Sequence, residues 1–315
     1  MKFKELKVGD TNVEVLALVV DCKVKQTVNG TPYYGLTISD GEDNADARIW
    51  SVSLASNLAH GEIENGNIYK LTVKVNDYAG KNQIIINKIE DVDLSSIDVS
   101  TFFKSAPVDI QIIKDKIHDK IDSLENPIIK KIVEDLLLPR MDAFLMHQAA
   151  VTMHHNYLGG LAYHVYSMLN ISEKVLENYP ALNPDLLTAG ILIHDLGKME
   201  EITSDKSPSY SKEGNLLGHI VIGLRLLDEV VRQNGFSGTD EALALEHMII
   251  AHHGELEYGS PKEPLIMEAH ALYLIDYMDA KLAGANDYVA KTPKGSTTNP
   301  IPSLGKKALY VPKIK

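Results

Sequence analysis

Apolar and polar residues alternate over short runs in the first part of the chain, and turn-forming residues separate the runs. The runs are rich in β-branched residues and read "NVEVLALVVDCKVKQTV" (12–28), "YYGLTISD" (33–40), "ADARIWSV" (45–52), "IYKLTVKVNDY" (68–78) and "NQIIINKIEDV" (82–92). Alternation with a period of two predicts half-buried strands, and "NGTP", "GEDN" and "AGK" predict the turns between them. We therefore expect a barrel of five strands with a short helical insert around residues 53–60.

A small closed barrel of this kind is typical of the OB type, which often binds single-stranded nucleic acid through a strand face and its loops. Tyr33, Tyr34 and Trp50 provide rings on which bases can stack, and Lys74 lies on a strand where it can reach phosphates. The alternative is that these aromatic residues belong to the barrel core and that the lysine lies on a solvated face. The pattern alone leaves both interpretations open.

The apolar period changes from that of strands to that of helices after "DLSSIDVSTFFKSAP" (93–107), which we predict to be a linker. Helices are expected from Val108 onward and then at about 140–150, 159–178, 184–197, 216–234, 239–253 and 264–285. The predicted fold is multi-domain α+β, with an all-β OB-like barrel (1–92), an all-α domain (108–290) and a basic tail (291–315). We expect the tail to wrap the body or to meet a neighbouring subunit.

Composition excludes several classes of function. The formal net charge is −12, which argues against broad electrostatic binding of duplex DNA but leaves room for a local groove for one strand. Cys22 is the only cysteine, so neither an internal disulfide nor a thiolate zinc site can form. The N-terminal sequence lacks the apolar segment of a signal peptide, and "VLALVV" (15–20) is too short to span a bilayer. We expect a soluble, cytoplasmic protein without a membrane partner.

Histidines with helical spacing are the strongest chemical signal. His164, His194, His219 and His252 are separated by roughly 24–33 residues, about one helix and its connection, so a helical bundle can point one imidazole from each at a shared centre. Imidazole combined with the carboxylates of Asp195 and Asp276 suits Mn²⁺, Fe²⁺, Co²⁺, Ni²⁺ or Zn²⁺, and a bridging carboxylate allows one or two ions.

Lys198 lies one helical turn beyond His194, on the same side of a helix. Its ammonium could offset charge on a bound phosphate, or it could be a cation favoured at a helix C-terminus.

Several motifs give the chain a family resemblance. "HDLGK" (194–198), "AHHG" (251–254) and "LIDYMDAK" (274–281), together with His164 and His219, resemble the HD superfamily of metal-dependent phosphohydrolases. With the preceding barrel, the segments "MHHNYLGGLAYHVYSM" (153–168), "GNLLGHIVIG" (214–223) and "HHGELEYGSP" are similar to the bacterial YhaM family of 3′→5′ exoribonucleases. The resemblance covers essentially the whole chain and is strongest over residues 150–285.

The resemblance implies an enzyme that hydrolyses single-stranded RNA from its 3′ end to nucleoside 5′-monophosphates with a divalent metal, Mn²⁺ being favoured. Single-stranded DNA is a further substrate to test, and self-association into a homo-oligomer is implied. Asp195 would stand at the catalytic centre, Lys198 would neutralise phosphate, and His155 would protonate the leaving oxygen. The implied metal ligands are His164, His194, Asp195, His219, His252 and Asp276, with His253 ligating or supporting and Asp279 a rival of Asp276 for the last position.

Two other functions fit parts of the sequence. The helical part fits an HD phosphohydrolase of nucleotides or cyclic dinucleotides equally well, although "HHGELEYGSP" lacks the GYP signature of cyclic-dinucleotide enzymes. The barrel also fits a non-catalytic nucleic-acid-binding protein whose metal is structural.

Overall fold

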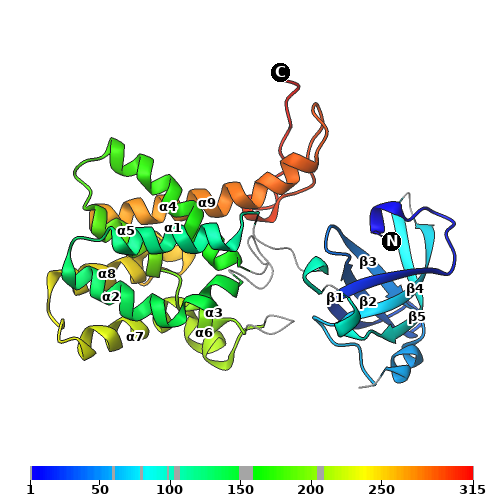
Figure 1. Ribbon diagram of the computed structural model, residues 1–315. Helices are drawn as coiled ribbons and strands as arrows, with labels where there is room; N and C mark the ends of the chain where they lie inside the picture. The colour runs from blue at the N-terminus through cyan, green and yellow to red at the C-terminus, as the bar shows by residue number, and fades with distance from the viewer. Residues whose placement is uncertain are drawn as a thin grey trace. The chain divides into compact units, whose positions relative to one another are not determined.

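The computed structural model describes residues 2–58, 61–78, 81–97, 99–102, 107–148, 159–203 and 209–314. The chain forms two compact units, a barrel up to Phe102 and a helical unit from Pro107 onward. Figure 1 shows both units, and each is described below by itself.

The N-terminal unit is a closed five-stranded barrel, as the alternating pattern predicted. Its strands follow one another in the order β1-β2-β3-β5-β4, and β4 returns to pair with β1. All neighbouring strands are antiparallel except β3 and β5, which are parallel. The expected helical insert is a 3₁₀ helix at Val52–Asn57. The strand bounds are β1 Val13–Gln26, β2 Pro32–Ser39, β3 Asn44–Ile49, β4 Ile68–Tyr78 and β5 Lys81–Asp91.

Alternate strand positions fill the barrel because successive side chains of a strand point to opposite faces. Val19, Ile38 and Leu71 are fully buried in this core.

The first part of the segment expected to be a linker (93–107) packs on the barrel instead. Phe102 is buried against Leu18 and Ile68 of the barrel, with Leu94 and Ile97 packed beside it. Apolar side chains at these positions therefore hold the described residues of this segment onto the barrel.

The second unit is a bundle of helices around α5. Every residue of α5 from Leu187 to Ile193 is buried, and α5 packs against α2, α4, α8 and α9 (Figure 1). A helix that is apolar on all sides must lie inside a bundle, which explains this central place. The helix bounds are α1 Ile110–Asp122, α2 Pro127–Leu137, α3 Met141–Met146, α4 Gly160–Asn178, α5 Pro184–Ile193, α6 Lys198–Glu201, α7 Lys212–Gln233, α8 Asp240–Ala251 and α9 Met267–Lys291.

The expected helix 184–197 ends early, at Ile193. Asn183 caps its start by accepting hydrogen bonds from two backbone N–H groups, and Pro184 occupies the first helical position. Beyond Ile193 the backbone turns, with the N–H of Lys198 donating to the carbonyl of Asp195. No side chain fits at Gly197, because a Cβ there would lie 2.0 Å from the carbonyl oxygen of His219 in α7. The prediction of one continuous helix was wrong for residues 194–197, which form this turn.

The basic tail packs back on the helical unit. Ile301 is fully buried, and the tail pairs with itself through the bridges Thr297–Tyr310 and Ile301–Lys307. The Ser303 hydroxyl donates to the carbonyl of Lys281 in α9, at 3.4 Å. Among the described helices, none combines the length and the apolar character needed to cross a membrane.

Candidate metal centre

Side chains from four helices or helix ends meet around the carboxylate of Asp195. His164 comes from α4, His194 follows α5, His219 lies in α7, and His252 follows α8. Oδ2 of Asp195 lies 3.4 Å from Nε2 of His194 and 3.9 Å from Nε2 of His164. Oδ1 lies 3.6 Å from Nε2 of His219 and 3.7 Å from Nε2 of His252. The four histidines that the sequence singled out are thus brought to one centre.

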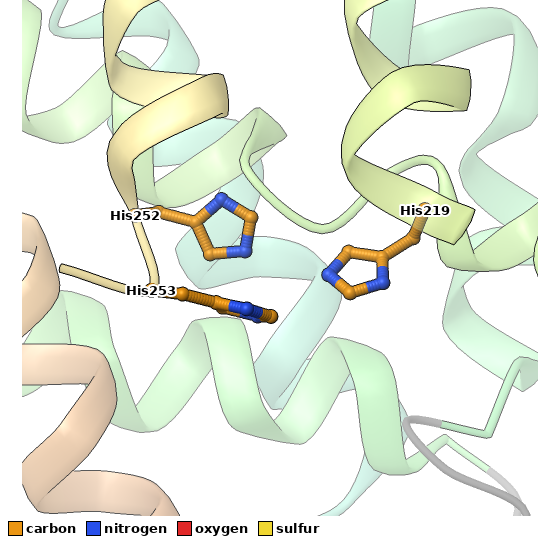
Figure 2. A group of neighbouring side chains, drawn as sticks. All are labelled: His219, His252 and His253. Carbon is orange, nitrogen blue, oxygen red and sulfur yellow. The ribbon is translucent and has the colours of Figure 1, made fainter. Parts of the chain in front are cut away.

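The two oxygens of Asp195 face two different sets of potential ligands. One set is His164, His194 and Asp195 itself, and the other is His219, His252 and His253; the ligand atoms within each set lie within 4.8 Å of one another. Figure 2 shows the second set, with the ring of His219 directed toward those of His252 and His253. A carboxylate between two such sets is the arrangement that a pair of bridged divalent ions requires.

The ends of α5 and α8 orient two of these imidazoles. The last carbonyls of a helix have no intrahelical partner. Nδ1 of His194 lies 3.0 Å from the carbonyl oxygen of Ile191, and Nδ1 of His252 lies 2.7 Å from that of Ile249. A carbonyl only accepts, so Nδ1 carries the proton and Nε2 presents its lone pair to the centre. A histidine directly after an apolar helix therefore donates from Nδ1 to a free carbonyl at the helix end and presents Nε2 to the centre.

Four inward-facing atoms are buried without a hydrogen-bond partner in the described part of the chain: Nε2 of His194, His219 and His252, and Oδ1 of Asp195. Buried polar atoms without partners are costly and rare in folded proteins. Oδ1 of Asp195 lies 3.6 and 3.7 Å from two of these nitrogens, and all four atoms are ligands of the kind that first-row divalent metals prefer. The residues present therefore fit a divalent cation.

Asp276 and Asp279 contact opposite nitrogens of His164. Sequence spacing alone could not decide which of the two is the last metal ligand. Oδ1 of Asp276 lies 3.2 Å from Nε2, on the side of the centre. Oδ2 of Asp279 lies 2.7 Å from Nδ1, and its other oxygen accepts a hydrogen bond from the Ser167 hydroxyl at 2.5 Å. Asp276 is therefore placed to ligate a metal, whereas Asp279 holds the ring of His164 from behind.

Sequence reasoning missed Glu201, which supports His219 in the same way. Its carboxylate lies 3.2 Å from Nδ1 of His219 and also accepts the backbone N–H of that residue. The contact depends on a kink in α7 at Gly218, whose φ of +73° favours glycine. The second glutamate of "GKMEE" was the available signal, but its partner follows 18 residues later and beyond the kink.

Neighbouring charges in the centre shift the pKa values of its members. Nζ of Lys198 donates to Oδ2 of Asp195 at 2.7 Å. Burial alone would raise the pKa of Asp195, but the neighbouring charges of Lys198 and His194 hold it well below its usual range. Burial likewise opposes charge on His164, yet its hydrogen bonds to Asp276 and Asp279 raise its pKa to about 10. Burial and nearby His194 lower the pKa of His252.

His155, the candidate proton donor, lies outside the described residues, so its role stays a prediction from the sequence. His253 is near the centre: its ring is 5.1 Å from that of His219, and its Nδ1 lies 2.9 Å from the carbonyl oxygen of Tyr258. The centre has a more open side as well, because His219, His253 and Asp276 are partly exposed while His194 and His252 are fully buried.

The barrel brings together three of the four residues predicted to bind a strand. The rings of Tyr33 and Trp50 lie 4.9 Å apart, and the guanidinium of Arg48 lies over both rings. Lys74 pairs with Ile85, which pairs with Arg48, so Lys74 shares their outer face. We call Tyr33, Arg48, Trp50 and Lys74 the outer row.

Tyr34 does not belong to the outer row. It pairs with the fully buried Ile49 and packs against the barrel core. Side chains alternate along β2, so adjacent tyrosines must point to opposite faces. The position of Tyr34 therefore agrees with the alternative interpretation, in which the aromatic residue belongs to the barrel core.

Comparison with known proteins agrees with this geometry. The family model of the HD domain matches residues 161–281. A protein from a Geobacillus species named "3'-5' exoribonuclease YhaM" is 35% identical over 307 residues, which cover 97% of this chain and 93% of the relative. Proteins of the same name from Halalkalibacterium halodurans and Listeria innocua are 35% and 34% identical over 90% and 98% of this chain, and over 88% and 97% of their own lengths. The chain therefore belongs to the YhaM family of 3′→5′ exoribonucleases.

Proposed function

We propose that the protein is a metal-dependent 3′→5′ exoribonuclease that shortens single-stranded RNA and releases nucleoside 5′-monophosphates. One observation supports the proposal most directly: four buried ligand atoms around Asp195 have no hydrogen-bond partner in the described residues and point at one centre. The names of the relatives supply the reaction, and the HD domain supplies the class of chemistry.

A divalent metal, or a pair bridged by Asp195, would be held by the residues that surround that carboxylate. We propose Mn²⁺, because imidazole and carboxylate donors together suit it, with Co²⁺, Fe²⁺, Ni²⁺ and Zn²⁺ as alternatives to test. Such an ion, when bound, lowers the pKa of water and neutralises phosphate oxygens. The proposed ligands are His164, His194, Asp195, His219, His252 and Asp276, with His253 completing the second set.

The chain itself positions the reacting groups. Asp279 and Glu201 fix the rings of His164 and His219, so the nitrogens facing the centre need no rearrangement when a substrate arrives. Lys198 adds a cation beside Asp195, where it can offset charge on the phosphate. Attack of water on the terminal phosphorus breaks the bond to the preceding 3′ oxygen, which takes a proton, and the terminal nucleotide leaves as its 5′-monophosphate.

The outer row of the barrel is proposed to bind the strand upstream of its 3′ end. Tyr33 and Trp50 present adjoining rings, and Arg48 and Lys74 supply positive charge on the same face. Aromatic rings with interspersed cations bind single strands without strong sequence preference. This mode admits single-stranded DNA, so discrimination between RNA and DNA has to be measured.

Incubation of the protein with Mn²⁺ and 5′-labelled single-stranded RNA tests the proposal. We expect a ladder that shortens from the 3′ end, and Asp195→Ala should abolish it while leaving strand binding nearly intact, because the barrel carries its own binding face. A matched DNA strand and free nucleotides serve as parallel substrates. Turnover of nucleotides alone would indicate the other kind of HD phosphohydrolase, and binding without cleavage would indicate a structural metal.

Self-association into a homo-oligomer is also proposed. Leu274 and Leu282 of α9 are 60% and 62% exposed, and Met267 and Met278 lie along the same side of this helix. A row of exposed apolar residues often marks a protein contact. Light scattering on the purified protein measures the mass; a monomer at micromolar concentration would contradict the proposal.

A further inference from the structure

Three tyrosines form a continuous aromatic surface beside the metal centre. The rings of Tyr258 and Tyr277 lie 6.4 Å apart and within 26° of parallel, and the ring of Tyr273 lies 5.9 Å from that of Tyr277. Tyr258 is 51% exposed and Tyr277 is 41% exposed. We call these three residues the tyrosine shelf. Large aromatic side chains left exposed next to each other are unusual on a surface that binds nothing.

The shelf is attached to the metal centre at two points. Tyr277 follows Asp276 directly in α9. The carbonyl of Tyr258 lies 2.9 Å from Nδ1 of His253, so the loop that carries Tyr258 also orients an imidazole of the centre. A ligand whose phosphate reaches the open side of the centre therefore has aromatic rings within reach.

The members of the shelf differ in their surroundings. Tyr273 packs directly against the backbone of Gly254, and its hydroxyl donates to Glu255 at 3.5 Å, so it holds the loop after His253 in place. Tyr258 and Tyr277 lie with their rings nearly parallel to each other, and both side chains stay about half exposed. Burial explains Tyr273 as a structural residue, but it does not explain the two exposed rings.

Positive charge completes the surface. Nζ of Lys281 lies 5.0 Å from the centre of the Tyr277 ring, one helical turn further along α9. Exposed rings with a cation over one of them match a nucleotide, which has a flat base and an anionic phosphate. Glu255 accepts from the Tyr273 hydroxyl and adds negative charge to the shelf, so Lys281 supplies the positive charge that a phosphate needs at Tyr277.

We propose that Tyr258 and Tyr277 stack the base of the 3′-terminal nucleotide and so position its phosphodiester at the metal centre, with Lys281 contacting the adjacent backbone. The inference rests on the proposed exoribonuclease function. Stacking accepts any base, because every base has a π face, so the shelf would hold RNA ends of any sequence. The two tyrosines are positioning residues and take no part in the bond change.

The test compares two single-stranded RNAs that differ only at the 3′-terminal nucleotide, which carries its base in one and is abasic in the other. For the unaltered protein with Mn²⁺ we expect kcat/KM to fall roughly 5- to 150-fold when the base is missing. Tyr277→Ala should slow cleavage of the complete RNA by a similar factor, mainly through KM, and should cleave both RNAs at nearly the same rate. Tyr277→Phe keeps the ring and should retain the preference for the complete end.

Tyr179→Ala is the matched control, because Tyr179 is 55% exposed and follows the end of α4 that is opposite to His164. The Mn²⁺ content of each variant, measured directly, shows whether the centre is intact. If Tyr277→Ala loses metal, Tyr258→Ala replaces it, since Tyr258 contacts the centre through its backbone carbonyl rather than its ring.

The outcomes separate the inference from the function on which it rests. A protein that shortens RNA but does not distinguish the two ends, or a Tyr→Ala variant that keeps metal and the full preference, overturns the role of the shelf and leaves the exoribonuclease proposal standing. A protein that shortens neither RNA overturns the exoribonuclease proposal itself.

Discussion

Individual histidines in this protein are oriented by an acceptor on their outer side. His194 and His252 use the free carbonyls at helix ends, whereas His164 and His219 use the carboxylates of Asp279 and Glu201. The sequence could predict that these imidazoles converge, because spacing and residue type show it. It could not predict the outer partners, since these depend on where a helix ends, where it bends or how two helices pack together.

Substitutions of the two aspartates of α9, Asp276 and Asp279, should reduce RNA cleavage to different extents. Asp276→Asn removes a proposed ligand and should abolish RNA cleavage. Asp279→Asn removes only the support of His164 and should weaken Mn²⁺ affinity or activity by roughly 10- to 100-fold. Mn²⁺ titration with an RNA cleavage assay measures both, and Asp287→Asn, on an exposed part of the same helix, is the control. Equal loss from the two substitutions would contradict the assignment.

Most helices and strands could be predicted from periodicity, because burial on one face enforces it. The errors fall at two backbone irregularities. The helix α5 stops at Ile193 and the turn after it brings Gly197 against the backbone of α7, and α7 itself bends at Gly218. Close approach between segments far apart in sequence leaves no periodic signal. These two irregularities are also what bring Asp195 and His219 together.

The contact between α1 and α4 predicts a pH-dependent stability. Glu173 of α4 lies 2.6 Å from Lys116 and 2.9 Å from Lys120 of α1, and these hydrogen bonds lower its pKa to about 2. A lowered pKa stabilises the fold above the unfolded value of about 4.3 and loses that effect as pH falls toward 2.

Glu173→Gln should therefore lower the free energy of unfolding by about 1 kcal/mol at pH 7, a value that allows for solvent screening at this half-exposed site. The difference from the unaltered protein should shrink to less than half at pH 3. Urea unfolding at the two pH values measures it, with Glu177→Gln, which pairs with Lys174 on its own helix, as control. A difference that is the same at both pH values would contradict the ion-pair origin.

At the scale of the whole molecule, each of the two units carries one of the two proposed sites. The helical unit carries the centre, and the barrel carries the outer row. The family and the order of the two folds could be predicted from the motifs, because "HDLGK" and its partners are specific. The faces of the barrel could not be assigned, because Tyr33 and Tyr34 are equivalent in the sequence until the strand register separates them.

This division predicts that the barrel affects long strands more than short ones. Trp50→Ala removes a 42% exposed ring and should weaken binding of a long single strand by roughly 1–3 kcal/mol. Turnover of a di- or trinucleotide, which depends on the metal centre alone, should stay unchanged. Trp50→Phe keeps a ring and should bind nearly normally. Filter binding and cleavage assays on the two lengths provide the measurement.

The shortest strand pairing in the barrel is that between β3 and β5. Among the described residues β3 and β5 meet only at Ala47–Ile84 and Arg48–Ile85, whereas β4 and β5 pair over nearly their whole length. The outer row crosses this seam, with Tyr33, Arg48 and Trp50 on one side and Lys74 on the other. An RNA strand bound across the row would contact residues on both sides of this seam, so its binding should stabilise the folded barrel against unfolding. RNA affinity and barrel stability are therefore thermodynamically linked.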